Sequence, residues 1–116
     1  MLERMVKIPG PWPFHGTVVW LTPEQGGRSS GPPAPSAEID YAHTAFVPPR
    51  TLETGLASFA LRNFDAGAWT SAAEGTWLIV ENEGDQRVEP GTVIVCTEGH
   101  RVVAYFHVER VAGTTE

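Results

Sequence analysis

The sequence of 116 residues has little cysteine and no long apolar run. Its one cysteine, Cys96, excludes an internal disulfide, so nothing in the chain calls for an oxidising compartment and we expect it in the cytoplasm. No apolar stretch approaches the roughly 18 residues of a membrane-spanning helix, and residues 1–5 lack the order of a secretory signal. We therefore expect no membrane association.

Positive charge is also scarce, since Lys7 is the only lysine beside seven arginines and the formal net charge is −6. Because phosphate contacts need clustered cations, this balance argues against DNA and against general nucleic-acid affinity. Arginine makes forked, specific contacts, so a local RNA site stays open. A small acidic chain more often binds another protein.

A helical pattern is missing as well. No apolar stripe with a period of about 3.6 residues is long enough to cover a core, whereas 12 glycines and 10 prolines favour short strands and frequent turns. The expected strands are residues 14–21, 56–64, 68–70, 76–81, 92–97 and 100–111. This pattern predicts an all-β domain, either a small barrel or a sandwich.

Around these strands, the chain divides by composition. Residues 1–13 end in the proline-rich IPGPWP and form an extended N-terminal arm, residues 14–112 form one domain, and residues 113–116 are a tail. Residues 22–36 are a loop, and the apolar patch within residues 37–54 fits either a short strand or a helix. We expect Trp20 and one of Trp69 or Trp77 in the core, with Trp12 exposed or packed on the edge.

The last two strands form a hairpin whose two sides are both largely apolar. With Glu98 and Gly99 as a two-residue loop, Val95 would face Val102 and Cys96 would face Arg101. An antiparallel sheet with one wet face alternates more clearly than this. One side should therefore be core, and the other covered by residues 37–54 or by a partner.

No enzymatic motif is found. Gly26-Gly27-Arg28 has glycines but no lysine, and Pro32 and Pro33 prevent the helix that a phosphate-binding loop opens. We therefore expect no nucleotide hydrolysis, no cofactor and no catalytic residue.

The histidines, His15, His43, His100 and His107, lack ligand spacing, so we expect no metal. Cys96 is expected to be a packing residue. The alternative is a small enzyme that uses Cys96, His100 or His107 in a cleft under the long loop.

Two stretches in order resemble one known family. FHGTVVWLTPEQGGR (residues 14–28) resembles the first strand and loop of the third, C-terminal domain of bacterial elongation factor Tu, and GTVIVCTEGHRVVA (residues 91–104) is similar to its closing hairpin. Residues 58–62, 65–67 and 75–81 look like its second strand, the following turn and its fourth strand. The resemblance covers about 80 residues.

This resemblance implies a closed six-stranded antiparallel β-barrel with a long loop insertion at about residues 29–55. It places Ile94, Cys96 and Val103 inside the barrel, and Val93, Val95 and Val102 outside. It also implies a binding module without GTPase activity that meets a protein partner or tRNA or other RNA at one rim. The rim residues are Gly26, Gly27, Arg28, Glu98, Gly99, His100 and Arg101. A structural subunit that forms a homodimer through an exposed barrel side is a further alternative.

Overall fold

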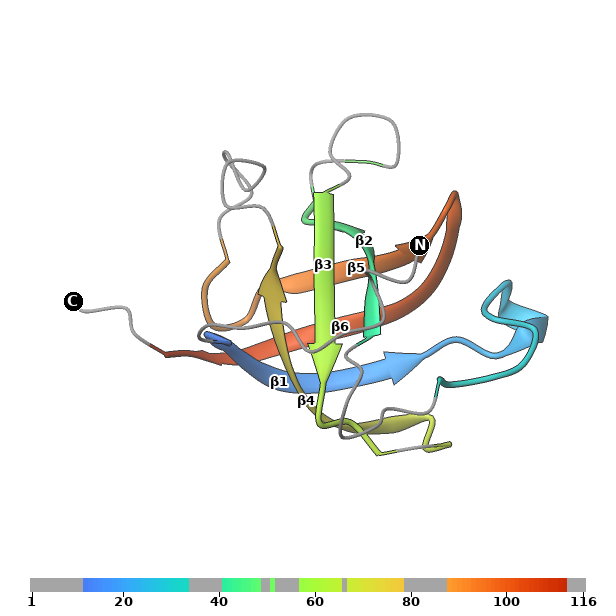
Figure 1. Ribbon diagram of the computed structural model, residues 1–116, viewed down its shortest axis with the longest axis horizontal. Helices are drawn as coiled ribbons and strands as arrows, with labels where there is room; N and C mark the ends of the chain where they lie inside the picture. Colours follow the sequence, from blue (N-terminus) through green and yellow to red (C-terminus); the bar gives the residue numbers. More distant parts are fainter. Residues whose placement is uncertain are drawn as a thin grey trace.

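Six antiparallel strands close into a barrel in the order β1-β4-β3-β2-β5-β6 (Figure 1). The computed structural model describes residues 12–33, 41–48, 51, 57–65, 67–78 and 88–112. The strands are β1 (Phe14–Trp20), β2 (Tyr41–Phe46), β3 (Ala57–Arg62), β4 (Thr70–Trp77), β5 (Val93–Glu98) and β6 (Arg101–Val111). The expected all-β class and closed six-stranded barrel are confirmed. No helix among the described residues is long and apolar enough to cross a membrane.

Two segments that were expected to be separate strands belong to a single strand, and the sixth strand of the barrel comes from another part of the sequence. Residues 68–70 and 76–81 were expected as separate strands, but β4 runs without a break through Thr70–Trp77, and residues 79–81 lie outside the described residues. The sixth strand is β2, which lies inside the segment 29–55 that we expected as a long loop insertion, and of the two structures left open for residues 37–54 it is the strand. It pairs with β3 on one side and β5 on the other, so this segment contributes a strand to the barrel wall.

The barrel interior is filled by side chains from alternate positions, as the period of two residues in a strand requires. In β1 the buried positions are Phe14, Gly16, Val18 and Trp20. The largest fully buried side chains are Phe59, Phe106, Leu61, Ile94, Val18 and Val103. Gly75 makes room for two of them, because a Cβ at this position would lie 2.6 Å from the Phe59 ring and 3.0 Å from the Phe106 ring.

The closing hairpin has a different register from the one expected. Glu98 pairs with Arg101, so the turn residues are Gly99 and His100, and Gly99 has the positive φ of 63° that this turn needs. A register shift between Cys96 and Thr97 places an extra residue in β6.

Because of this shift, the neighbouring residues Val103 and Ala104 are both completely buried. Ile94, Cys96 and Val103 are buried, as expected, but Val95 is also covered, with 7% of its surface exposed. On the outer side of the hairpin Val95 and Thr97 are therefore covered, whereas His107 is exposed.

A second irregularity lies between β1 and β6. His15 pairs with Arg110 while Gly16 pairs with Val108, so Glu109 is the additional residue in β6. Glycine is required at the bend, because a Cβ on Gly16 would lie 1.9 Å from the carbonyl oxygen of His107. The bulge leaves both Glu109 and Arg110 exposed on the outer surface.

Of the two expected placements of Trp12, exposed or packed on the barrel edge, the structure has the packed one. Trp12 is buried, and the Arg62 guanidinium lies 4.4 Å from the centre of its ring. Trp20 and Trp77 are in the core, and Trp69 is 44% exposed. The described end of the N-terminal arm is therefore held against the barrel by an aromatic side chain.

Candidate functional site

The Gly-Gly-Arg loop begins with a capped single-turn 3₁₀ helix, Pro23–Gln25. The Thr22 hydroxyl accepts from the Gln25 backbone N–H, and the Gln25 side chain accepts from the Thr22 N–H, which makes a capping box. Gly26 ends the turn with φ 90°, and Gly27 lies where a Cβ would be 2.3 Å from the Leu21 carbonyl oxygen. The glycine pair is therefore a tight turn that brings the chain back over the end of β1.

Arg28 is held in place at this turn by contacts with three neighbours. Its Nε lies 3.1 Å from Glu98 Oε2, its Nη1 donates to the Gly31 carbonyl at 3.2 Å, and its guanidinium carbon is 5.8 Å from the centre of the Tyr41 ring. The Tyr41 hydroxyl donates to the same Glu98 carboxylate. Burial, together with the Glu98 carboxylate, raises the pKa of Tyr41, so the phenol remains a donor.

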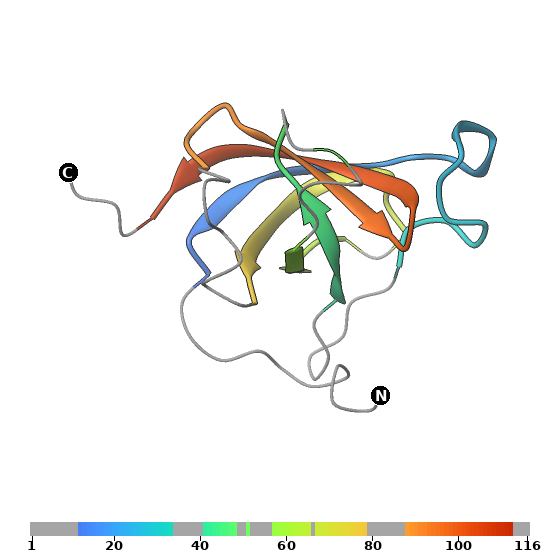
Figure 2. The ribbon, with the colours of Figure 1, turned by 90° about the horizontal axis from the view of Figure 1, so that it is seen from above.

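The two stretches that were expected to meet are also joined by Arg101. Its Nη1 donates to the Gly27 carbonyl oxygen at 3.0 Å, across 74 positions of sequence. Figures 1 and 2 show the loop after β1 and the turn between β5 and β6 at the same end of the barrel. We call the surface of Gly26, Gly27, Arg28, Trp69 and residues 98–101 the rim.

Trp69 is the rim residue that the sequence did not assign to it. It is the only exposed large hydrophobic side chain among the described residues. Its carbonyl accepts from the Trp20 N–H at 2.8 Å, at the end of β1, and a Cβ on Gly31 would lie 3.7 Å from its ring. Trp69 immediately precedes β4, in which the alternate residues Ser71, Ala73 and Trp77 are buried. Because Trp69 lies outside this alternating pattern, the periodicity could not predict whether its side chain is exposed.

The three residues proposed for an enzyme, Cys96, His100 and His107, differ in their exposure to water. Cys96 is completely buried inside the barrel, and burial raises the pKa of its thiol, which disfavours the thiolate. His100 is exposed at the hairpin turn, and His107 is exposed on β6. No group of three or more histidine, cysteine, aspartate or glutamate side chains suited to a metal comes together in the described part of the chain.

His43 is the one buried histidine. Its ring lies 4.8 Å from that of Tyr41 and 5.7 Å from that of Phe59, and Nδ1 is 2.8 Å from the Thr44 carbonyl oxygen. Nδ1 therefore carries the proton, and Nε2 is buried without a hydrogen-bond partner among the described residues. Burial lowers the pKa of His43 to about 4, so the ring is neutral at neutral pH.

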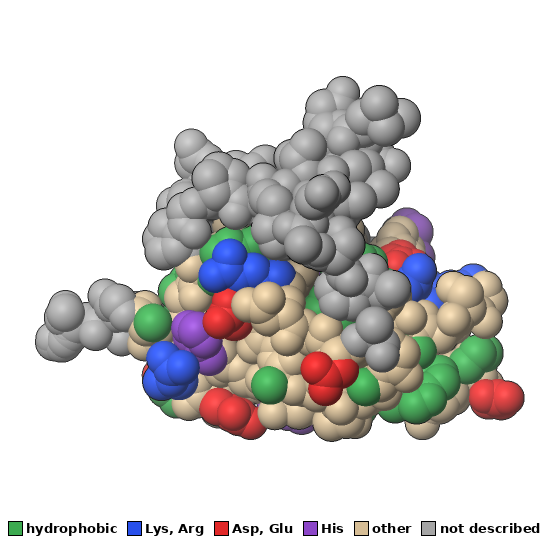
Figure 3. Space-filling view, turned by 60° about the horizontal axis from the view of Figure 1, so that its bottom comes forward, with side chains coloured by type: hydrophobic (Ala, Val, Ile, Leu, Met, Phe, Trp, Pro, Cys, Tyr) green, Lys and Arg blue, Asp and Glu red, His purple; other side chains and the backbone are tan. Residues whose placement is uncertain are grey.

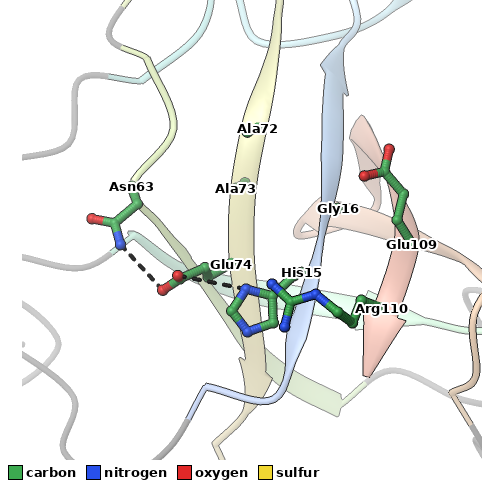
Figure 4. A pocket seen from close by; sticks show the side chains of 8 residues that line it. All are labelled: His15, Gly16, Asn63, Ala72, Ala73, Glu74, Glu109 and Arg110. Carbon is green, nitrogen blue, oxygen red and sulfur yellow. Dashed lines mark hydrogen bonds and ion pairs between the residues drawn. The ribbon is translucent and has the colours of Figure 1, made fainter. Parts of the chain in front are cut away.

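A separate cleft of about 320 Å³ opens on the outer face of β1, β4 and β6 (Figure 4). Its lining residues are His15, Gly16, Asn63, Ala72, Ala73, Glu74, Glu109 and Arg110. Figure 3 shows acidic, basic and histidine side chains side by side towards one end of this face of the molecule. No sequence motif indicates this cleft, because its polar residues come from four strand or strand-end segments that are distant in the chain.

Glu74 contacts three other polar side chains in or beside the cleft. Arg62 Nε lies 2.7 Å from its Oε1, Asn63 Nδ2 donates to the same oxygen at 3.1 Å, and His15 Nδ1 lies 3.6 Å from Oε2. Partial burial acts to raise the pKa of Glu74, but the hydrogen bond and charge of Arg62 outweigh it and lower the pKa. The carboxyl group is therefore ionised at neutral pH.

No known protein family matches this chain, and neither a curated protein nor a solved structure matches it.

Proposed function

We propose that this barrel is a non-enzymatic module that binds a protein partner at the rim, similar in role and fold to the third domain of elongation factor Tu. The observation that carries the proposal is the exposed ring of Trp69 beside the ordered Gly-Gly-Arg loop. Exposed tryptophan is a frequent anchor of protein interfaces, because it buries a large area with few rotatable bonds. The cytoplasmic location inferred from the single cysteine is part of the same proposal.

The surroundings of Trp69 favour an interface, because the loop beside it is already rigid. The capping box orders the turn, and Arg28 is tied to both Glu98 and Gly31. A partner that docks here therefore pays little to order this loop.

The charges of the rim favour protein over RNA. The Arg28 charge is offset by the Glu98 carboxylate at 3.1 Å, and Arg101 already donates to Gly27. A phosphate backbone would have to compete with these contacts, and the whole chain carries a net charge of −6. RNA remains the second candidate, because Arg101 is exposed and has further donors for a phosphate.

The test is a pull-down from native lysate with the wild-type chain and Trp69→Ala, each with and without nuclease. A protein partner is expected to be retained after nuclease treatment and lost with Trp69→Ala. The matched control is His107→Ala, an exposed aromatic side chain on β6 outside the rim, which should retain the partner. The proposal fails if Trp69→Ala retains every protein that the wild type retains.

RNA binding gives a different pattern in the same experiment. Nuclease would then remove the bound material, Arg101→Ala would weaken binding, and affinity would fall steeply with added salt. A partner that is bound through the Trp69 ring should instead tolerate added salt, because burial of apolar area is not screened.

A further inference from the structure

The cleft on β1, β4 and β6 lies at the opposite end of β6 from the rim, since Arg110 is near the last residue of this strand and Arg101 is its first. We propose that this cleft binds a small ligand through an oxyanion group, a carboxylate or a phosphate monoester. The proposal is independent of the rim and of the protein partner. It rests on how the charged side chains of three neighbouring strands are oriented.

The negative charge of Glu74 is already compensated within the protein. Arg62 Nε and Asn63 Nδ2 both contact Oε1, at 2.7 and 3.1 Å. His15 turns Nδ1 towards Oε2 at 3.6 Å, so its other ring nitrogen, Nε2, faces away from the carboxylate. Glu74 therefore orients the imidazole and presents little uncompensated negative charge to a ligand.

Arg110 supplies positive charge at the same place. It is the cross-strand neighbour of His15, and its guanidinium has no ion-pair partner among the residues that the structure describes. Figure 4 shows its side chain extending from β6 across β1 towards the His15 ring. A guanidinium offers two parallel donors that match a carboxylate or phosphate, and a protonated or Nε2–H imidazole beside it supplies a third.

The second carboxylate of the cleft does not occupy this position. Glu109 accepts from the Thr17 hydroxyl at 2.8 Å, and Figure 4 shows it pointing away from the His15 and Arg110 side chains. The β-bulge at Gly16 is the cause, because it adds Glu109 to the strand and leaves Arg110 opposite His15. Bulges often re-aim side chains next to functional sites.

The size and floor of the cleft limit the ligand. Its volume of about 320 Å³ is at the lower end of small-molecule sites. The floor is formed by the backbone of Gly16 and Ala73, which are inward positions of their strands, and by the exposed methyl group of Ala72, so the space between the longer side chains stays open. A single ring or a short chain bearing the anionic group fits this space.

The experiment is an NMR titration of the full ¹⁵N-labelled chain with inorganic phosphate, phenyl phosphate and benzoate. We expect saturable shifts of the backbone amides of Gly16, Ala72 and Glu74. Arg110→Gln should weaken binding by at least about tenfold, the usual loss for a charged hydrogen-bonding partner. The matched control, Arg101→Gln, removes the same charge at the rim and should change affinity by less than about twofold.

A second variant tests the floor without touching a charge. Ala72 is exposed, so Ala72→Phe should leave the spectrum dispersed while it fills the hollow and abolishes the shifts caused by phenyl phosphate. Saturation by benzoate alone assigns a carboxylate ligand, by the phosphates alone a phosphate monoester, and by both an oxyanion in general. The proposal is overturned if no probe saturates by about 10 mM, if Arg101→Gln weakens binding as much as Arg110→Gln, or if a folded Ala72→Phe binds phenyl phosphate like the wild type.

Discussion

The buried ring of His43 makes the stability of this barrel depend on pH in a defined window. Its pKa is about 4 in the folded chain, against about 6.5 in the unfolded chain. Between these values the unfolded chain binds a proton that the folded chain does not. The free energy of unfolding is therefore at its full value above about pH 6.5, where His43 is neutral in both states. It decreases as the pH falls towards 4, because only the unfolded chain gains the proton.

The magnitude follows from the size of the pKa shift. A difference of about 2.5 units corresponds to about 3 kcal/mol in total, of which about 2 kcal/mol is lost between pH 7 and pH 5. The carboxyl of Glu74, whose pKa is lowered, titrates below this interval.

The perturbation is His43→Phe, which keeps a ring between Tyr41 and Phe59 but cannot be protonated. The Thr44 carbonyl oxygen, which loses the His43 donor, still accepts from the Thr97 hydroxyl at 3.2 Å. We expect the variant to lose less than about 0.5 kcal/mol between pH 7 and pH 5, because the buried titrating group is gone.

The assay is urea unfolding at each pH, with the free energy of unfolding extrapolated to water. His43→Leu serves as a second variant if the larger ring of phenylalanine strains the core. His107→Gln, which removes an exposed histidine, should keep the wild-type loss of about 2 kcal/mol. The reasoning is refuted if both His43 variants retain the wild-type dependence on pH.

Three further predictions concern the packing of the barrel. Gly16→Ala should destabilise the chain by more than about 2 kcal/mol, because its Cβ would lie 1.9 Å from a carbonyl oxygen, whereas Gly26→Ala, with open space but φ 90°, should cost only about 1 kcal/mol; urea unfolding that ranks them in the reverse order contradicts the bulge argument. Phe59→Ala should cost about 3–5 kcal/mol, because the ring is fully buried among other aromatic side chains, and a loss below about 1 kcal/mol would mean that the interior is not packed as described. Cys96 should react with iodoacetamide only in denaturant, measured by mass spectrometry, and rapid labelling of the native chain would contradict its burial.

The two strands that the sequence analysis did not place, β2 and β4, have few large apolar residues among their inward positions. β4 buries Ser71, Ala73 and Gly75 before Trp77, so its inward side carries almost no hydrophobic signal. These small residues are needed because Phe59 and Phe106 occupy the space in front of Gly75. A strand whose inward residues are small, because large side chains of neighbouring strands fill the space, is therefore hard to recognise from its own sequence.

The segment of β2 was left open between a short strand and a helix for a related reason. Its inward residues are Tyr41, His43 and Ala45, while the apolar Phe46 lies outside the core cluster. The usual alternation is thus reversed in part, and propensity alone left a strand or a helix open. The expected number of six strands was correct although two of its members were not.

The rim was more accessible to prediction than the cleft. Gly-Gly-Arg and Glu-Gly each lie at a turn, and the resemblance placed both turns at one end, where the structure joins Arg28 to Glu98 and Arg101 to Gly27. Residues of the cleft lie mid-strand or at strand ends without a motif. Their meeting depends on which strands are neighbours and on a bulge that shifts β6 by one residue.

By itself, the sequence determined the all-β fold class and the location of most of the strands and turns. Alternation with a period of two, and glycine where φ is positive, are local properties that neighbouring residues encode. Only the tertiary structure decided that β2 completes the wall, that Trp69 is exposed, and that His15 lies between Glu74 and Arg110. These features depend on strand order and register, which are set by contacts between distant segments and by the space that large core side chains require.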